Sequence, residues 1–470
     1  MKKSRGFPYI PHTEEDIRRM CRAVGVGSVD ELLDIFPAGL RLKGPLNLPD
    51  GLSEQEVKGL LEKISAGNST TADYSSFLGA GAYNHYIPSA IDRIISRSEF
   101  YTSYTPYQPE VSQGTLQAIF EYQTLICQMT GMEVSNASLY DGASATAEAV
   151  LMARRITAKK KVILSSALHP EYRQVARTYL SGAGDGIEEV FYCTEKGTTL
   201  PEAVKAVMDN DTACLVVQHP NFFGCCEDVA ALADIVHEKK ALLIVTVTEP
   251  LSLGILRPPG ETGCDIVAGE AQSFGIPLNY GGPHLGFMAT GGRNSRQMPG
   301  RIVGQTIDRK GARSFCLTMA TREQHIRREK ATSNICTNQG LNALACAVYL
   351  ALLGKGGLVE LARLNLSKAH YLKERLAAVG VKTAFSSPFF NEFVIETEEP
   401  AKQPASTASQ PSSTERFLKT LLKKGIIGGL SLKRFYPSLD RHVLVTATEM
   451  NSKEEIDGYA AVVADVFLKA

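Results

Sequence analysis

The chain has 470 residues, which is enough for a large core and about two or three domains. Its 50 Lys and Arg residues balance its 50 Asp and Glu residues, so no global basic field attracts nucleic acid or an anionic membrane. A locally basic stretch, residues 322–330, is offset by Glu323 and Glu329. We expect a solvated helix face or an interface there.

Apolar runs and cysteines bear on compartment and metal binding. No apolar run approaches the roughly 20 residues of a membrane span, and the charged residues 1–5 lack the apolar segment of a signal peptide. The ten cysteines form no CxxC pair, which favours a reduced, cytoplasmic chain. The spacing of His219, Cys225, Cys226 and His237 matches no structural zinc site, so we expect no metal.

Residues 1–75 are predicted to form an arm of short helices. Thr13 starts a capping-box pattern that has Asp16 at its last position, and Ser53 starts a full one. A third short helix is predicted over residues 28–36. The apolar stripes of these helices are too small for a separate core, so we expect the arm to wrap something larger.

Residues 76–330 have the pattern of a large α/β domain. An amphipathic helix is predicted over residues 122–129 because apolar side chains recur there at helical spacing. Short apolar strands then alternate with helices, which predicts a mainly parallel sheet covered on both faces. The predicted strands are residues 162–164, 214–217 and 242–245, with a helix over residues 229–236 before the last.

Residues 331–470 contain fewer helices per strand, which predicts a smaller α+β domain. A long helix is expected from Gly340, interrupted near Gly354. Residues 392–397 and 443–448 are predicted strands, and a final amphipathic helix contains Ile456, Tyr459, Ala460 and Val463. Residues 400–414 are rich in Ser, Pro, Gln, Ala and Thr, so we expect a flexible loop.

A loop of small and hydroxyl residues precedes the helical run that starts at residue 147. Such a loop at a helix N-terminus can hold a phosphate through backbone N–H groups and the helix dipole. Ordinary capping of the helix by its own side chains explains the same pattern equally well. The residues that would make a phosphate site are Asp141, Gly142, Ser144 and Thr146.

Two irregular segments are rich in aromatic residues. The front loop, residues 77–88, reads FLGAGAYNHYIP, and the tyrosine segment, residues 104–110, reads YTPYQPE. Such loops line small-molecule sites and subunit contacts more often than they fill cores, with loop packing by tyrosines as the alternative. No dinucleotide fingerprint, P-loop or nucleophile elbow is present. The candidate site residues are Tyr83, Asn84, His85, Tyr86, Tyr104, Tyr107, Gln108 and Glu110.

The strings FLGAGAYNHYIP, YTSYTPYQPEVSQGTLQAIFEYQ and REKATSNICTNQGLNALA resemble signatures of the amino-terminal half of the glycine cleavage system P-protein. The resemblance covers nearly the whole chain. It implies the fold of fold-type I pyridoxal-phosphate enzymes: a seven-stranded, mostly parallel sheet and a smaller C-terminal domain. It also implies an α₂β₂ assembly with a second subunit. That complex decarboxylates glycine and passes the aminomethyl group to the lipoyl arm of H-protein.

Pyridoxal-phosphate chemistry needs a lysine that bonds the cofactor and an acid that protonates its pyridine nitrogen. The segment EAQSFGIP resembles the lysine-bearing segment of the catalytic subunit, and aligning Phe-x-Ile-Pro places Gln272 at the lysine position. A looser alignment of VTVTEPL places Val247 at the acid position, with Glu249 two residues on. Lys310 and Lys330 are conceivable substitutes, but both lie outside the matching motif.

The resemblance therefore implies a degenerate cofactor site in this chain, to which His169 would also belong as a relic of ring stacking. Pyridoxal phosphate would sit in the partner subunit, and the front loop and the tyrosine segment would help to shape that site. Two alternatives stay open. One is a self-sufficient pyridoxal-phosphate enzyme with a misplaced lysine. The other is a purely structural or regulatory subunit.

Overall fold

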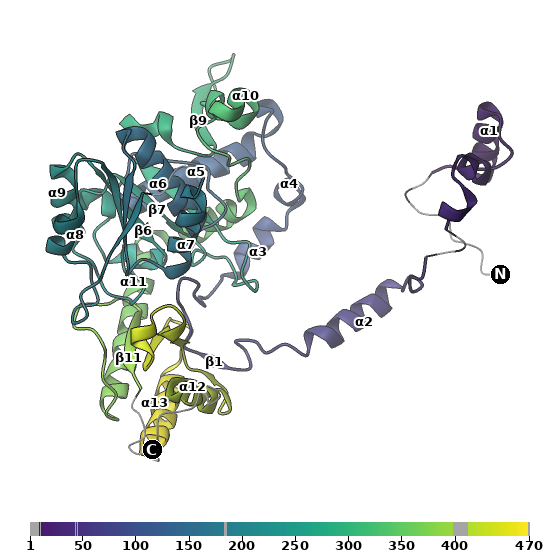
Figure 1. Cartoon of the computed structure of the whole chain (residues 1–470). Coiled ribbons are helices and arrows are strands. Elements are labelled where there is room, and N and C mark those ends of the chain that lie inside the picture. The colour runs from purple at the N-terminus through teal and green to yellow at the C-terminus, as the bar shows by residue number, and fades with distance from the viewer. Residues whose placement is uncertain are drawn as a thin grey trace. The chain divides into compact units, whose positions relative to one another are not determined.

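The computed structural model describes residue 9 and residues 11–42, 44, 46–182, 186–397 and 412–468. It divides into two compact units, Met1–Ser69 and Thr70–Ala470 (Figure 1). The division of the second unit near residue 330 stays a prediction. Most of the predicted flexible loop, residues 400–411, lies outside the described residues.

The first unit is built from short helices with the predicted caps. In α1 (Glu14–Val24), Thr13 and Asp16 form a complete capping box, and in α2 (Glu54–Ser65) Ser53 forms one with Glu56. A 3-10 helix, Asp30–Ile35, takes the place of the third predicted helix. These capping predictions are confirmed, whereas the wrapping role of the arm stays a prediction.

The second unit contains a seven-stranded sheet of order β2-β8-β7-β6-β5-β3-β4. The strands from β7 to β4 run parallel, and β2 and β8 pair antiparallel at the other edge. The prediction of a mostly parallel sheet is confirmed. The strands are β2 (Val134–Ser135), β3 (Lys161–Ser165), β4 (Ile187–Val190), β5 (Thr212–Gln218), β6 (Leu242–Val247), β7 (Ile266–Glu270) and β8 (Gly286–Thr290).

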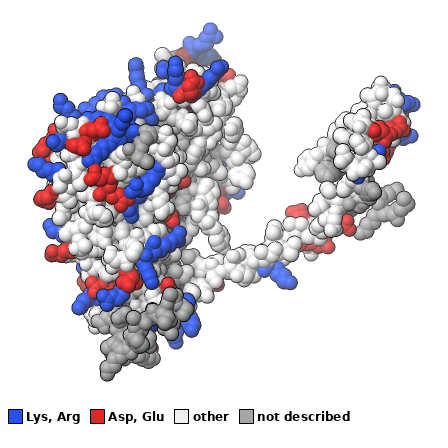
Figure 2. Space-filling view, in the orientation of Figure 1, with Lys and Arg blue, Asp and Glu red and all other residues white. Residues whose placement is uncertain are grey.

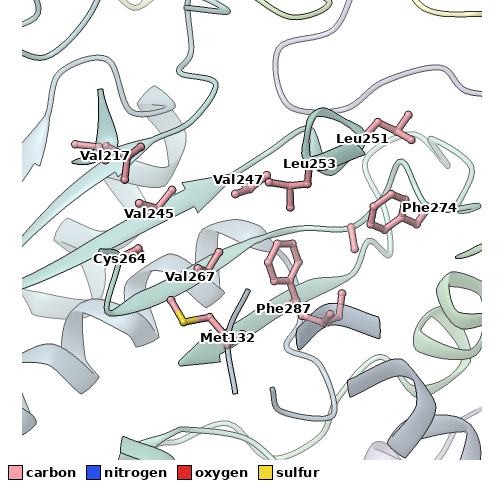
Figure 3. Packing of buried hydrophobic residues seen from close by; sticks show 14 of the residues in the cluster. Met132, Val217, Val245, Val247, Leu251, Leu253, Cys264, Val267, Phe274 and Phe287 are labelled. Atoms are coloured by element: carbon pink, nitrogen blue, oxygen red, sulfur yellow. The ribbon is translucent and has the colours of Figure 1, made fainter. Parts of the chain in front are cut away.

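Both faces of the central strands are buried, as continuous apolar runs require. In β6, Leu243 and Val245 belong to one core layer and Ile244 belongs to the other. Figure 3 shows Val217 beside Val245 on neighbouring strands of the first layer. The helices that cover the sheet are α5 (Gln113–Thr130), α6 (Gly142–Thr157), α7 (Pro170–Leu180), α8 (Pro201–Val207) and α9 (Val229–Glu238).

One described helix, α11 (Gly340–Ala377), is long and apolar enough to cross a membrane by length and composition alone. The sequence prediction that no run approaches a membrane span overlooked it. Its first half packs Ala343, Cys346 and Leu350 into the core of the large sheet. Its backbone breaks at Gly354, with φ of 59°, as the sequence predicted. The apolar composition therefore has a packing explanation.

The C-terminal part carries a small antiparallel sheet of order β11-β14-β13, which confirms the two predicted strands. Its first strand continues the core through Phe393 and Ile395, on which the final helix packs Tyr459. Ser412 caps α12, so the predicted flexible loop ends before it. The elements are β11 (Glu392–Glu396), β13 (Leu430–Ser431), β14 (His442–Thr446), α12 (Ser413–Leu422) and α13 (Lys453–Leu468).

The remaining strands and short α-helices of the second unit lie outside these two sheets. A short pair joins the start of the unit to the small sheet region, and a hairpin extends beyond α5. The short pair is β1 (Ser75–Ser76) with β12 (Ile426–Ile427), the hairpin is β9 (Ile302–Ile307) with β10 (Arg313–Thr318), and the short helices are α3 (Ser89–Ile95), α4 (Ser98–Tyr101) and α10 (Gln324–Arg327).

Candidate functional site

The carboxyl ends of the parallel strands form the edge at which α/β sheets bind ligands. Here β3, β5, β6 and β7 end close to the first turns of α6 and α7. We call this group of strand ends and helix starts the strand-end site. All of the residues predicted for a degenerate cofactor site lie in it or on the elements that build it.

The first turn of α6 is satisfied by the chain's own oxygens. Asp141 Oδ1 accepts the Ser144 N–H at 2.7 Å in a capping box, and Thr146 Oγ1 donates to the Gly142 carbonyl at 2.8 Å. The Gly142 N–H donates to Glu270 Oε2 at 2.9 Å. The loop therefore caps α6 with its own side chains. A second carboxylate, Glu270 at the end of β7, also accepts an N–H of the first turn.

Gln272 follows β7 and is 2 % exposed. Its Oε1 accepts the Tyr83 N–H at 2.9 Å, and its Nε2 donates to the Tyr83 carbonyl at 3.1 Å and to the Ile276 carbonyl at 2.7 Å. One side-chain amide therefore pairs with both backbone groups of a front-loop residue. Lys310 and Lys330, the conceivable substitutes for a lysine at this position, are exposed.

His169 caps α7 and packs between aromatic rings. Its Nδ1 accepts the Glu171 N–H at 3.2 Å, so Nε2 carries the proton and donates to the Ala80 carbonyl at 2.9 Å. Burial lowers the pKa of His169, which keeps the imidazole neutral. A Cβ added to Gly81 would lie 3.1 Å from the His169 ring. The front loop thus covers one edge of this ring.

Val247 ends β6 inside the apolar core, and Glu249 follows it. The Glu249 carboxylate bonds His85 Nε2 at 2.9 Å, and Glu449 bonds His85 Nδ1 at 2.8 Å. Burial alone would lower the pKa of His85, but the two carboxylates raise it to about 10. Both ring nitrogens are therefore occupied by an ion-pair network that joins the front loop to both sheets.

Tyr83 points its hydroxyl into the same buried region. It donates to Glu392 Oε2 at 3.1 Å, and Ala80 N–H donates to Glu392 Oε1 at 2.7 Å. Burial raises the pKa of Glu392 to about 7 against the opposing effect of these hydrogen bonds. The Asn84 carbonyl accepts from Thr448 Oγ1 at 2.7 Å. Tyr83 is therefore a buried link between the loop and the small sheet.

The exposed candidates form a second set. Tyr86 is 61 % exposed, Tyr104 is 76 % exposed and Tyr107 is 57 % exposed, and Gln108 and Glu110 are exposed as well. The structure therefore separates the predicted site residues into a buried set, which includes Tyr83 and His85, and an exposed aromatic set.

A buried cation lies beneath the tyrosine segment. Arg301 is 4 % exposed and donates to Thr105 Oγ1 at 3.1 Å, to Tyr107 Oη at 3.1 Å and to Asn338 Oδ1 at 3.4 Å. Its Nε has no hydrogen-bond acceptor, and Glu323 lies 3.9 Å away. A cavity of about 240 Å³ opens beside it, lined by Tyr104, Thr105, Asn338, Gly340 and residues of α5.

Sequence reasoning missed Glu270, Glu449, Glu392 and Arg301. Glu270 stands two residues before Gln272, so its place was readable from the same motif. Glu392 and Glu449 come from a part of the chain more than 300 residues after the front loop, and no local pattern connects them. Within the described residues, no three His, Cys, Asp or Glu side chains group as a metal ion would require.

Comparison with known proteins shows the family to which this chain belongs. The profile of the family described as Glycine cleavage system P-protein matches residues 8–463. The probable glycine dehydrogenase (decarboxylating) subunit 1 of Geobacillus thermodenitrificans is 49 % identical over 457 residues, which cover 97 % of this chain and 98 % of that protein.

Two solved structures bear on the fold. A glycine decarboxylase (P-protein) of the glycine cleavage system, in inhibitor-bound form, has a TM-score of 0.85 at 41 % identity, covering 98 % of this chain and all of that one. The sphingosine-1-phosphate lyase of Burkholderia pseudomallei has a TM-score of 0.64 at 13 % identity, covering 93 % and 95 % of the two chains. The chain belongs to the glycine cleavage system P-protein family and has the fold of fold-type I pyridoxal-phosphate enzymes.

Proposed function

We propose that this chain is the non-catalytic subunit of a two-subunit glycine decarboxylase. With a second subunit, in an α₂β₂ heterotetramer, it decarboxylates glycine and passes the aminomethyl group to the lipoyl arm of H-protein. The names of its relatives, which are called subunit 1 of a decarboxylating glycine dehydrogenase, support the activity and the need for a partner. All ten cysteines are unpaired, which supports a reducing cytoplasmic compartment.

Gln272 is the observation that supports assigning the cofactor chemistry to the partner subunit. A glutamine amide cannot bond a carbonyl cofactor as a lysine amine does. The position expected to hold the acid for the pyridine nitrogen is the apolar Val247, and Glu249 is engaged by His85. The first N–H of α6 is already bonded to Glu270. The strand-end site therefore does not fit pyridoxal phosphate, and we place the cofactor in the partner subunit.

Pyridoxal phosphate supplies an electron sink when it is bound in the partner. The exposed aromatic set of this chain supplies a surface that can close over the partner's site. Figure 2 shows Lys and Arg mixed with Asp and Glu over much of the second unit, whereas the surface around α3 and α4 carries few charges. Exposed tyrosines on such a surface are typical of protein contacts, because they bury a large area with few rotatable bonds.

This chain's own contribution to chemistry is positioning and the exclusion of water. Arg301 places a buried positive charge behind Thr105 and Asn338, which line the cavity at the tyrosine segment. A carboxylate or another anionic group in that cavity would gain from this charge, although Glu323, 3.9 Å from Arg301 Nε, offsets part of it. Tyr104, which lines this cavity, would then help to keep water from that group. The glycine carboxylate, the cofactor and the lipoyl arm remain alternative targets of these side chains.

A specific observation favours the purely structural alternative for part of the front loop. Tyr83 and His85 are 2 % and 7 % exposed, and their polar atoms are bonded within the chain. We therefore assign these two residues to holding the loop, and we keep Tyr86 and the tyrosine segment as candidates for contact with the shared site.

The test is borohydride reduction after addition of pyridoxal phosphate, on the isolated chain and on the chain mixed with its partner. Mass spectrometry then locates any pyridoxyl-lysine. We expect label in the partner only. Label on a lysine of this chain would contradict the proposal. Exchange of labelled carbon dioxide into glycine, measured in the mixed complex with Tyr86→Ala, separates contribution to the site from a structural role, because a structural subunit would leave this exchange unchanged.

A further inference from the structure

We propose that the strand-end site of this chain is a socket for its own front loop, and that Gln272 is the positioning residue that holds this loop for the shared active site. Glu270 acts on the loop only through Gln272, whose backbone N–H it accepts. The positioning role rests on the proposed function. The socket itself is a property of the isolated chain. Residues 80–83 lie across the strand ends from His169 on one side to Gln272 on the other.

Gln272 has the chemistry that the socket needs. Holding a backbone by both of its polar groups takes one acceptor and one donor, which a side-chain amide carries and a lysine ammonium does not. Gln272 uses its acceptor for the Tyr83 N–H and its donors for the carbonyls of Tyr83 and Ile276. Gln272 therefore makes a contact with the Tyr83 backbone that a lysine at this position could not make.

Glu270 supplies the internal anion of the socket. Its carboxylate is 2 % exposed and accepts three backbone N–H groups, from Gly142 at 2.9 Å, Gln272 at 3.0 Å and Leu285 at 2.8 Å. It stands at the positive end of α6, where a fold of this kind offers donors to an anion. A Cβ at Gly142 would lie 2.9 Å from the Glu270 Cβ, so glycine is needed for this approach.

The other end of the loop is fastened at His169 and Glu392. The Ala80 carbonyl accepts from His169, while the Ala80 N–H donates to Glu392. The backbone bends here, with φ of 60° at Ala80 and 95° at Gly81. This bend brings Gly81 against the His169 ring, where a side chain would be crowded. The loop is thus bonded at both ends across the strand-end site.

The socket predicts the effect of placing a lysine at residue 272. In Gln272→Lys the ammonium would have no acceptor for the Tyr83 N–H, and the front loop would still cover the strand ends. We therefore expect this variant to gain no pyridoxal phosphate. We also expect the loop to loosen, because two hydrogen bonds to its backbone are lost or strained. The exposed Tyr86, three residues after Tyr83, would then lose its fixed position.

The matched control is Gln123. It is also a buried glutamine, 7 % exposed, and its amide pairs with both backbone groups of Val303 at 2.9 and 3.0 Å. Gln123→Met and Gln272→Met each remove a pair of hydrogen bonds to the backbone of one residue, outside the strand-end site and inside it respectively. Gln272→Met also removes the bond to the Ile276 carbonyl. A general loss of stability would affect both variants, whereas a loss of positioning would affect Gln272→Met alone.

Hydrogen exchange of the isolated chain is measured first. In the unchanged chain the Tyr83 amide is expected to be protected. In Gln272→Met the amides of residues 80–86 should exchange at least about tenfold faster, since one buried hydrogen bond is worth about this factor. Gln123→Met should leave these amides unchanged. Fast exchange of the Tyr83 amide in the original chain, or equal exchange in both variants, would overturn the socket. The first of these results does not depend on folding of Gln272→Met.

The second measurement uses the reconstituted complex with glycine. With all of the partner subunit bound to this chain, we expect Gln272→Met to raise the KM for glycine or to lower kcat several-fold. Gln123→Met should leave both constants unchanged. Trapping of pyridoxyl-lysine at residue 272 in Gln272→Lys would overturn the socket. Label at another lysine of the unchanged chain would instead overturn the proposed function and leave the exchange result standing.

Discussion

His85 Nε2 and Glu249 Oε2 form a buried ion pair at 2.9 Å between the front loop and the end of β6. Glu449 completes the network on the other ring nitrogen and also accepts the Tyr86 N–H at 2.7 Å. A loop residue is thereby tied to the large sheet and to the small sheet by one imidazolium. We expect the order of the front loop to depend on this charge. The free energy of unfolding should therefore depend on the protonation of His85.

The first prediction concerns the pH dependence of stability through His85. The two carboxylates raise its pKa from 6.5 to about 10 in the folded chain, against the effect of burial. A raised pKa gives stability that is fully present below pH 6.5 and is lost as the pH rises through about 10. In His85→Gln we expect a loss of about 3–5 kcal/mol at neutral pH, because two buried carboxylates lose their cation.

Urea unfolding at a series of pH values checks this prediction. The difference in unfolding free energy between the original chain and His85→Gln should shrink between pH 6.5 and about 10. A difference that stays constant over this window would show that the imidazolium does not form the proposed pairs.

A second pH effect involves Glu392. Burial raises its pKa from 4.5 to about 7, although hydrogen bonds from Ala80, Thr446 and Tyr83 oppose the change. The contribution of this carboxyl is fully present below pH 4.5 and is lost as the pH rises through about 7. Glu392→Gln carries no ionisable group, so it should gain stability relative to the original chain over this window. Unfolding at matched pH values measures the difference, and a pH-independent difference would refute this origin.

The exposed aromatic set should carry affinity for the partner subunit. Tyr104 is 76 % exposed, so Tyr104→Ala should leave the unfolding temperature of the isolated chain nearly unchanged. Binding to the partner should weaken by about tenfold or more, as for an aromatic residue at the centre of an interface. Sedimentation or titration calorimetry measures the affinity. Phe191→Ala is the control, since Phe191 is 75 % exposed after the edge strand β4. Equal effects of the two substitutions would argue against this interface.

Arg301 is expected to order the tyrosine segment. Arg301→Lys keeps the charge but cannot reproduce three hydrogen bonds to Thr105, Tyr107 and Asn338. We expect a loss of about 2 kcal/mol in unfolding free energy and faster amide exchange in residues 104–107. Arg293→Lys, at an exposed arginine, is the control. Unchanged exchange in the tyrosine segment would show that it is ordered by other contacts.

The α/β architecture could be predicted from the sequence because its causes are local. Apolar runs such as residues 242–245 are strands in any buried sheet, and Thr13 and Ser53 cap helices through contacts three residues away. The break in α11 at Gly354 and the strands of the small sheet follow from the same local rules. The expectation of a glutamine at the lysine position also rests on a local pattern, since Gln272 stands inside the segment EAQSFGIP.

Only the tertiary structure decided which groups these side chains contact. Gln272 reaches Tyr83 across 189 residues of sequence, and His85 reaches Glu449 across 364. Contacts between residues so far apart in the sequence produce no periodicity and no regular spacing along the chain. They exist because the small sheet folds back beside the strand ends of the large one. The sequence therefore determined which side chains stand at the strand ends, and the tertiary structure decided that the front loop is bonded to them, because hydrogen bonds to buried backbone groups depend on proximity in space.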